Sequence, residues 1–184
     1  MDKKKVLTTI YTDGSCKGNP GKGGFAVYWE TKVNDILIDQ NLIAQPKDHT
    51  TNNERELSAF LQALEIAANT FRTAKRAGVE AKVVIVADSK YCLDPITKGW
   101  ISNWKAKGWK NNGEYRPNYQ LWQKVYDLIH TKIGNEDLVL KWVRGHQNNN
   151  SGNDLVDKYA VLACENQKAY RLTMKNFEGS VCCD

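Results

Sequence analysis

The first part of the chain carries a pattern of apolar and β-branched residues that predicts three short strands. Turn-forming residues separate the three stretches, as is typical of consecutive strands. The expected strands are Lys5–Thr12, Gly24–Glu30 and Asp35–Ala44. Three consecutive short strands commonly form an antiparallel meander, so we expect them to pair in chain order.

The rest of the chain alternates between helical and strand patterns. Within Asn53–Phe71, apolar residues recur every three or four positions, which predicts an amphipathic helix. Lys82–Ala87 is a continuous apolar run of the kind that forms a strand buried on both faces. The pattern also predicts short helices within Asp88–Gly113, a helix over Tyr119–Ile133, a strand over Leu138–Val143 and a helix over Asp154–Lys168.

The order of these elements predicts an α/β fold. Its mixed sheet would have five strands, the three of the meander and two parallel ones, with helices flanking the sheet. We expect one domain over residues 1–170 and a C-terminal tail over residues 171–184 that need not be ordered.

Composition and charge narrow the class of protein. With 184 residues, of which 41% are hydrophobic and 26% charged, the chain suits one globular domain in the cytoplasm. It contains no apolar run long enough to cross a membrane, and the segment after its basic start is too short for a signal peptide. The net charge of +5 favours a polyanionic partner. The five cysteines lack metal-binding spacing and are odd in number, so we expect reduced thiols.

The glycine-rich segment after the first strand does not fit either common phosphate-binding motif. It matches the dinucleotide pattern G-x-G-x-x-A, but it leads into a strand, whereas that motif must open a helix. It fails the Walker pattern, because Lys22 is followed by Gly23 and not by Ser or Thr. The glycines therefore indicate a tight turn or a place where a ligand approaches closely.

Two aspartates follow predicted strands in the same way. Asp13 follows the first strand and Asp88 follows Lys82–Ala87. The helix between these strands makes a crossover, so the strands should run parallel and present both aspartates at their carboxyl ends. Neighbouring strands lie about 4.8 Å apart, and a divalent cation would relieve the repulsion of two carboxylates that close. A simple turn cap would explain either aspartate alone, but it is a poor explanation of both.

Four motifs occur in an order that is specific to one family. They read TDGSCKGNPGKGG, TNNEREL, VADSKY and WVRGHQ…GNDLVDKYA. Together they resemble type 1 ribonuclease H over about residues 6–168. The resemblance implies a ribonuclease H-like fold, with residues 1–170 as the catalytic domain. It also implies an endoribonuclease that hydrolyses the RNA strand of RNA–DNA hybrids and leaves 3′-hydroxyl and 5′-phosphate ends.

The resemblance implies a carboxylate quartet that holds two Mg²⁺ ions, for which Mn²⁺ could substitute. Carried onto this chain, the quartet is Asp13, Glu56, Asp88 and Asp157. Helical periodicity cannot separate Glu56 from Glu54, and Asp154 competes with Asp157. The family's spacing selects Glu56 and Asp157. In this family the histidine at the position of His146 assists proton transfer or product release, which suits a group that titrates near neutral pH.

The resemblance also implies contacts to nucleic acid. The candidates are Gly14, Ser15, Cys16 and Asn19 in the glycine-rich segment, Thr51, Asn52 and Asn53 at the helix start, Ser89, and Trp100, Trp104, Lys105, Lys107, Trp109 and Lys110 in a basic stretch. That stretch resembles the basic protrusion of bacterial family members and should supply salt-dependent affinity. Trp100 and Trp104, four residues apart, favour packing over stacking on bases, so Trp109 is the better contact candidate.

Three alternatives stay open at the level of sequence. A non-catalytic nucleic-acid-binding domain could share the fold, but it would be expected to lack one of the carboxylates. An integrase or exonuclease on the same fold is the second alternative, and a fragment of a reverse transcriptase is the third. The favoured hypothesis predicts an RNA–DNA hybrid as substrate, no membrane, and a monomer without an obligate protein partner.

Overall fold

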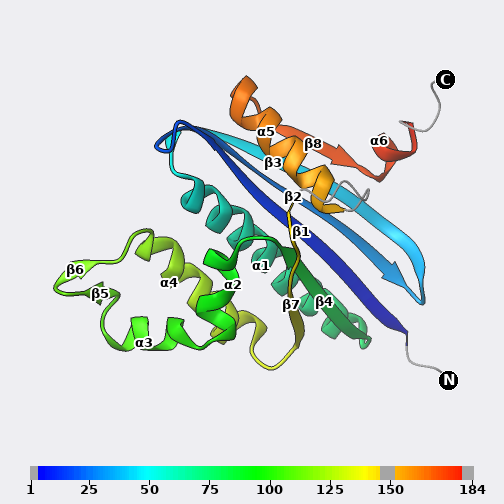
Figure 1. The fold of residues 1–184 in the computed structure, drawn as a ribbon. Helices are drawn as coiled ribbons and strands as arrows, with labels where there is room; N and C mark the ends of the chain where they lie inside the picture. Colours follow the sequence, from blue (N-terminus) through cyan, green and yellow to red (C-terminus); the bar gives the residue numbers. More distant parts are fainter. Residues whose placement is uncertain (1–3, 146–151, 180–184) are drawn as a thin grey trace.

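In the computed structural model, which describes residues 4–145 and 152–179, a six-stranded sheet carries helices on both faces (Figure 1). Its strands, in spatial order, are β7 (Asp137–Trp142), β4 (Glu80–Ala87), β1 (Lys5–Lys17), β2 (Gly21–Val33), β3 (Ile36–Thr50) and β8 (Tyr170–Thr173). The helical elements are α1 (Asn52–Ala77), α2 (Lys90–Thr97), α3 (Trp100–Ala106), α4 (Tyr119–Asp127), the π-helical turn η1 (Leu128–Ile133), α5 (Gly152–Asn166) and α6 (Met174–Gly179). A small hairpin, β5 (Lys110–Asn111) and β6 (Glu114–Tyr115), lies outside this sheet.

The pairing confirms the mixed α/β sheet. β1, β2 and β3 form the antiparallel meander, and β4 and β7 add in parallel beside β1. The predicted count of five strands is wrong, because β8 pairs antiparallel with Asn41–Ala44 of β3. β8 has only four residues, too few for an alternating apolar and polar pattern to predict the strand from sequence. It forms because the outer edge of β3 offers unpaired backbone N–H and C=O groups. Part of the expected C-terminal tail therefore belongs to the sheet.

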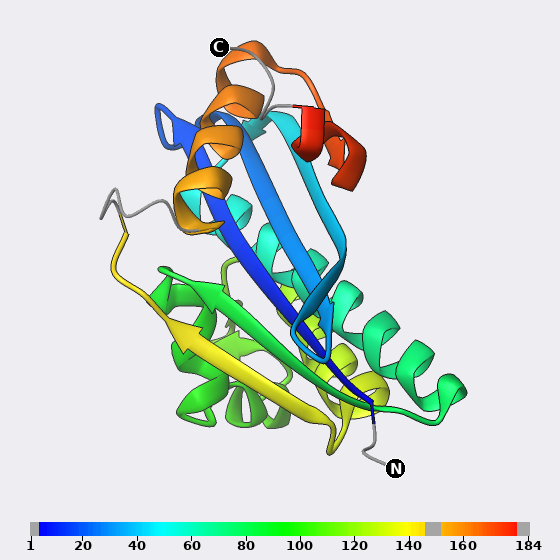
Figure 2. The ribbon, with the colours of Figure 1, turned by 90° about the vertical axis from the view of Figure 1, so that its right-hand side faces the viewer.

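Two helices cover the two faces of the sheet. α1 lies over β4, β1 and β2, and α5 lies over β1, β2 and β3 on the opposite face (Figure 2). The larger core lies under α1, where Leu57, Phe60 and Leu64 are fully buried against the sheet. α1 begins at the N-cap Thr51, whose side chain accepts a hydrogen bond from the Glu54 backbone N–H, and it ends at Gly78 in the left-handed conformation.

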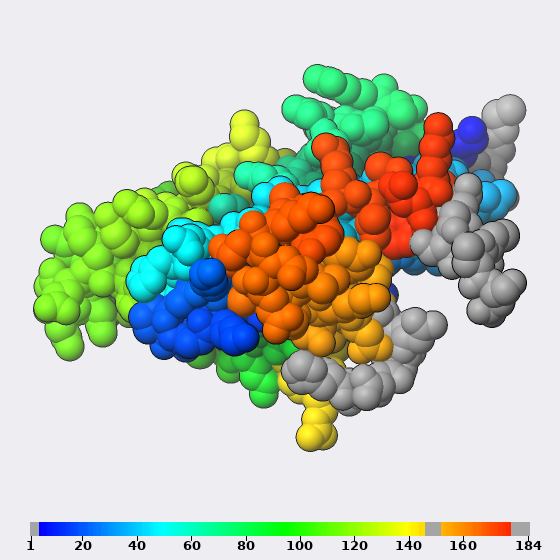
Figure 3. Space-filling model, turned by 90° about the horizontal axis from the view of Figure 1, so that it is seen from above, coloured from blue at the N-terminus to red at the C-terminus, as the bar shows by residue number. Residues whose placement is uncertain are grey.

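The segment from α3 through the β5–β6 hairpin to α4 forms an extension at one end of the molecule (Figure 3). Trp122 is its anchor, because its ring is fully buried and contacts Trp104 and Tyr91 edge to face at centroid distances of 5.3 and 5.6 Å. Within the described part of the chain, no helix has both the length and the apolar character that a membrane crossing requires.

Candidate active site

Three acidic side chains from separate segments of the chain meet where the parallel pairing of β1 with β4 ends. The predicted end of the first strand at Thr12 is wrong, because β1 continues through Asp13 to Lys17, where it still pairs with β2. In the parallel pairing Thr12 lies opposite Ala87, so the next residues, Asp13 and Asp88, lie at the same level. Glu56 joins them from the first turns of α1. Carboxylate oxygens of the three residues lie within 4.8 Å of one another. The structure thus brings together three of the four carboxylates that the sequence analysis selected.

Gly14 explains how α1 comes so close to β1. A Cβ atom added at Gly14 would lie 2.3 Å from the backbone nitrogen of Glu56, far inside van der Waals contact. Only glycine therefore allows the first turn of α1 to rest on the strand. The glycine-rich segment predicted a turn or a close-lying ligand, whereas at Gly14 the group that approaches is the protein's own helix.

Asp157 reaches the same site from α5. Its charge and its hydrogen bond to the Asp13 side chain both act on the Asp13 carboxyl group. Among the described residues, however, the cluster of close ligand atoms contains only Asp13, Glu56 and Asp88. Asp13 therefore lies between two sets of carboxylates, with Glu56 and Asp88 in one set and Asp157 in the other.

The electrostatics of the cluster suit a cation. Burial raises the pKa of Asp13 to about 8, with further contributions from Asp88 and Asp157, although the Gly14 N–H donates a hydrogen bond to the Asp13 carboxylate at 2.8 Å. Burial and the charges of Asp13 and Asp88 raise the pKa of Glu56 to about 9. Within the described ranges neither Asp13 nor Glu56 has an ion-pair partner. Converging carboxylate oxygens are the donor set that a hard divalent cation requires, so the residues present fit a metal ion.

The two rival glutamates have different surroundings. Glu54 points away from the cluster, and its carboxylate accepts hydrogen bonds from Lys47, from Thr50 Oγ1 at 2.8 Å and from Arg55 Nη2 at 3.0 Å. Burial would raise the pKa of Glu54, but the hydrogen bonds from Lys47 and Thr50 lower it. Sequence reasoning missed the buried Arg55, because the helical pattern gives no sign of its partners on β3.

Several predicted contact residues gather beside the cluster. Asn19 Oδ1 accepts a hydrogen bond from the Asn52 backbone N–H at 3.0 Å, which ties the β1–β2 hairpin to the start of α1. The Asn52 side chain also donates to Glu56, an effect that lowers the pKa of Glu56. Cys16 Sγ donates to the carbonyl oxygen of Thr50 at 3.4 Å. These contacts join the hairpin, the end of β3 and the start of α1 into one surface.

The remaining candidates near the cluster are placed as follows. Gly14 and Ser15 lie in β1, Asn53 is exposed in the first turn of α1, and Ser89 precedes α2 directly after Asp88. His146 lies outside the described residues, so its position and role stay a prediction.

The structure reverses the ranking of the tryptophans in the basic stretch. Trp109, expected to be the best contact, is only 7% exposed and packs into the core, because a left-handed turn after α3 directs its backbone N–H to the Trp104 carbonyl oxygen at 2.7 Å. Trp100, expected to pack, is 43% exposed with Lys98 Nζ 5.0 Å above its ring. Trp104 does pack, as predicted, against Trp122.

The lysines of the basic stretch lie on the surface. Lys105, Lys107 and Lys110 are all exposed. Lys105 Nζ lies 4.2 Å from the centre of the Tyr126 ring, and Lys110 Nζ lies 4.9 Å from the centre of the Tyr115 ring. These rings hold the two ammonium groups without neutralising them.

Comparison with known proteins decides the family. Residues 4–165 match the family model described as RNase H. The chain belongs to the RNase H family. Two relatives named Ribonuclease H agree with this. The protein of Rickettsia felis is 40% identical over 166 residues, which span 90% of this chain and 93% of the relative. The protein of Trichodesmium erythraeum is 36% identical over 168 residues, which span 90% of this chain and 93% of that relative.

Solved structures show the same fold. The crystal structure of LC9-RNase H1, described as a type 1 RNase H with the type 2 active-site motif, is 25% identical with a TM-score of 0.69 and covers 95% of this chain and 80% of that one. LC11-RNase H1 in complex with RNA/DNA hybrid is 19% identical with a TM-score of 0.60 and supports the fold alone. Members of the RNase H family are metal-dependent nucleases, and the three-carboxylate cluster is suited to bind a metal ion.

Proposed function

We propose that this protein is an endoribonuclease that hydrolyses the RNA strand of RNA–DNA hybrids at the carboxylate cluster. The observation that supports this most is the convergence of Asp13, Glu56 and Asp88 within 4.8 Å, where the parallel pairing of β1 with β4 ends. In open α/β sheets, ligands bind beside the carboxyl ends of the parallel strands. The products would carry 3′-hydroxyl and 5′-phosphate ends.

The metal ions proposed here are two Mg²⁺, with Mn²⁺ as a substitute. Glu56 and Asp88 would hold one, Asp157 the other, and Asp13 would be shared, as its place between the two sets suggests. When bound, such ions supply charge stabilisation of the reacting phosphate and a water activated for attack. The protein's part is to keep the oxygens in place: Asp13 and Asp88 are fixed by strands, and the close contact at Gly14 fixes Glu56.

Other residues would bind and orient the hybrid. Asn19, Asn52 and the backbone near Ser15 present donors and acceptors beside the cluster, where they can read the 2′-hydroxyl that distinguishes RNA from DNA. The exposed lysines of the basic stretch, Lys105, Lys107 and Lys110, would bind the phosphates of the DNA strand. His146 would hold the proton that the leaving 3′-oxygen requires.

The test is a cleavage assay in which each strand of a substrate is labelled in turn. RNA–DNA hybrid, duplex RNA, duplex DNA and single strands are each incubated with Mg²⁺ and then with EDTA. The proposal predicts cutting of the RNA strand of the hybrid alone, and its loss with EDTA. Binding of hybrid without cutting would favour a non-catalytic binding domain. Cutting of duplex DNA would favour an integrase or exonuclease.

We also propose that the protein works in the cytoplasm as a monomer. The described cysteines, Cys16, Cys92 and Cys164, form no disulfide with one another, which suits a reducing compartment. All elements that meet at the carboxylate cluster come from a single chain. Sedimentation at several concentrations tests the oligomeric state.

A further inference from the structure

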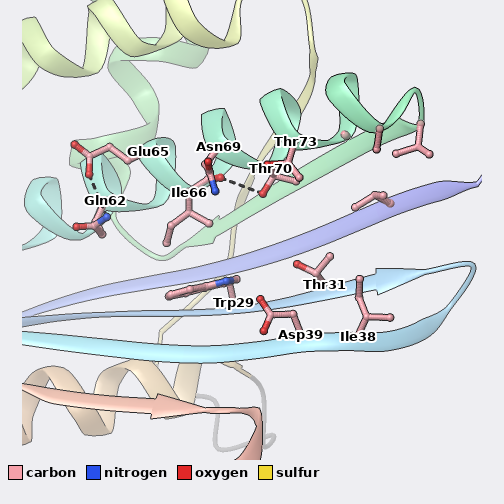
Figure 4. A pocket seen from close by; sticks show the side chains of 14 residues that line it. Trp29, Thr31, Ile38, Asp39, Gln62, Glu65, Ile66, Asn69, Thr70 and Thr73 are labelled. Atoms are coloured by element: carbon pink, nitrogen blue, oxygen red, sulfur yellow. Dashed lines mark hydrogen bonds between the residues drawn. The ribbon is translucent and has the colours of Figure 1, made fainter.

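A groove remote from the carboxylate cluster runs between α1 and the β2–β3 hairpin (Figure 4). It is lined by Val6 near the start of β1, seven residues before Asp13, which corresponds to roughly 23 Å along the strand. Its volume is about 590 Å³, within the range of pockets that bind small organic molecules. The groove exists because α1 packs over β4, β1 and β2 and does not extend sideways across the sheet to cover β3.

The strand side of the groove is built around one indole and a β-bulge. Trp29 on β2 presents its ring there, and Ile66 points toward it from α1 (Figure 4). The register between β2 and β3 shifts at Thr31, which leaves Ile38 as an extra residue beside Asp39. A bulge re-aims side chains, so Ile38 and Asp39 both line the groove although neighbouring strand residues normally face opposite ways. The Ile38 side chain is 53% exposed there.

The charges of the groove have a single sign. Its lining residues include two acids, Asp39 and Glu65, and no Lys, Arg or His. Asp39 accepts a hydrogen bond from Asn41 Nδ2 at 2.8 Å and Glu65 accepts one from Gln62 Nε2 at 3.1 Å, so the donors in both hydrogen bonds are neutral amides. Neither has an ion-pair partner within the described part of the chain. In a protein of net charge +5, this is a local negative site beside an aromatic face.

We propose that the groove binds a small organic cation that carries a flat aromatic ring. The ring would lie against Trp29 and between Ile38 and Ile66, where apolar contact supplies most of the affinity. The cationic group would be attracted by Asp39 and Glu65 and by the indole face. The same two carboxylates repel polyanions, so the groove is unsuited to the phosphates of a nucleic acid.

The probes are three compounds that share a naphthalene ring with a methylene group and differ in the polar group, which is cationic in 1-naphthylmethylamine, neutral in 1-naphthylmethanol and anionic in 1-naphthylacetate. Each is titrated into the Mg²⁺-saturated protein, because excess Mg²⁺ keeps the amine off the carboxylate cluster. The indole N–H signal of Trp29 in two-dimensional NMR, assigned with Trp29→Phe, reports on the groove. The amine should bind at this site about tenfold more tightly than the acetate, a difference typical of one favourable charge contact.

Two variants test separately how the charge and the shape of the groove contribute to binding. The double variant Asp39→Asn and Glu65→Gln should bring the affinities for amine and acetate within about twofold of each other, because only the charges are removed. Thr73 is an exposed residue that lines the groove, so Thr73→Trp should fill the groove and abolish the shift of the Trp29 signal. Arg76→Trp, at an exposed position of α1 that does not line the groove, should leave binding unchanged.

Three results would overturn the proposal. They are equal affinity for the amine and the acetate, chemical-shift changes centred on residues other than those of the groove, and binding that survives Thr73→Trp. Cleavage of hybrid by Thr73→Trp is expected to equal that of the unaltered protein. The binding measurements stand whether or not the proposed nuclease activity is found.

Discussion

At the scale of single residues, the carboxylate cluster is unfavourable unless a cation is present. Asp13 and Glu56 are buried close to other acids, and their raised pKa values express the cost of charging them in the folded protein. Asp13 was selected because it follows an apolar run, whereas helical periodicity could not separate Glu56 from Glu54, and the resemblance to ribonuclease H selected Glu56. The structure brings both side chains into the cluster, and their catalytic role stays a prediction. The prediction that Trp109 is the best nucleic-acid contact among the tryptophans of the basic stretch was wrong, because the left-handed turn that buries this ring depends on tertiary packing.

The raised pKa of Asp13 predicts how stability depends on pH without metal. Its pKa rises from 3.8 to about 8 on folding, so the protonated carboxyl favours the folded state. This stabilisation is complete below pH 3.8 and is lost as pH rises through about 8. In EDTA, Asp13→Asn should therefore melt at the same temperature as the unaltered protein near pH 4 and higher than it at pH 8 and above.

The measurement is thermal unfolding of both proteins across this pH range. Adding Mg²⁺ at pH 8 should raise the melting temperature of the unaltered protein and have a smaller effect on Asp13→Asn. A difference in melting temperature that stays constant with pH would contradict the account.

Gly14→Ala should disturb the site through the backbone. The new Cβ would lie 2.3 Å from the Glu56 nitrogen, so the first turn of α1 must move. We expect a loss of about 1–3 kcal/mol in the free energy of unfolding, as for other overpacked positions, together with a large fall in kcat. Gly78→Ala is the control, because nothing lies within 4 Å of that position and its φ of 67° makes alanine strained there. This variant should lose stability yet keep its kcat, and equal kcat values for the two variants would refute the role of Gly14.

At the scale of elements, strong periodicity gave reliable predictions and short elements did not. The start of α1 was predicted to within one residue and β4 to within two, because each carries a regular apolar pattern. The end of α1 was placed six residues too early, since the apolar pattern fades after Phe71 although the helix continues to Ala77. The helix predicted over Tyr119–Ile133 exists, but its last six residues form the π-helical turn η1. β8 and the β5–β6 hairpin were missed, since pairing with another strand defines strands this short, and a pairing partner cannot be read from local sequence.

The exposed lysines of the basic stretch should act together on hybrid binding. Each phosphate contact that is lost lowers the slope of log affinity against log salt concentration by about 0.9. Replacing Lys105, Lys107 and Lys110 by alanine should therefore weaken binding and flatten the salt dependence, with little change in kcat at saturating hybrid. Fluorescence anisotropy at several salt concentrations measures the slope.

A matched triple variant controls for net charge. It replaces three exposed lysines that lie near the end of α1, the start of β4 and η1: Lys75, Lys82 and Lys132. It removes the same total charge away from the basic stretch. If both triple variants changed the slope equally, the lysines of the basic stretch would contribute only through net charge.

At the scale of the whole molecule, the fold places chemistry and recognition on one surface. Two parallel strands, α1 and α5 deliver acids to one edge of the sheet, and the β1–β2 hairpin joins the start of α1 beside them. The groove over β2 and β3 lies toward the other end of α1 and β1. The α/β class and the mixed sheet could be predicted from sequence. The groove could not, because it depends on how far α1 covers the sheet in the direction of β3.

The most direct test of the central claim compares Asp13→Asn with Asp154→Asn in the Mg²⁺-dependent cleavage of labelled hybrid. Both variants remove one carboxylate, but only Asp13 belongs to the cluster of close ligand atoms. The account predicts that Asp13→Asn binds hybrid and does not cut it, while Asp154→Asn cuts at close to the normal rate. Normal cleavage by Asp13→Asn would contradict the claim that the cluster is the catalytic centre.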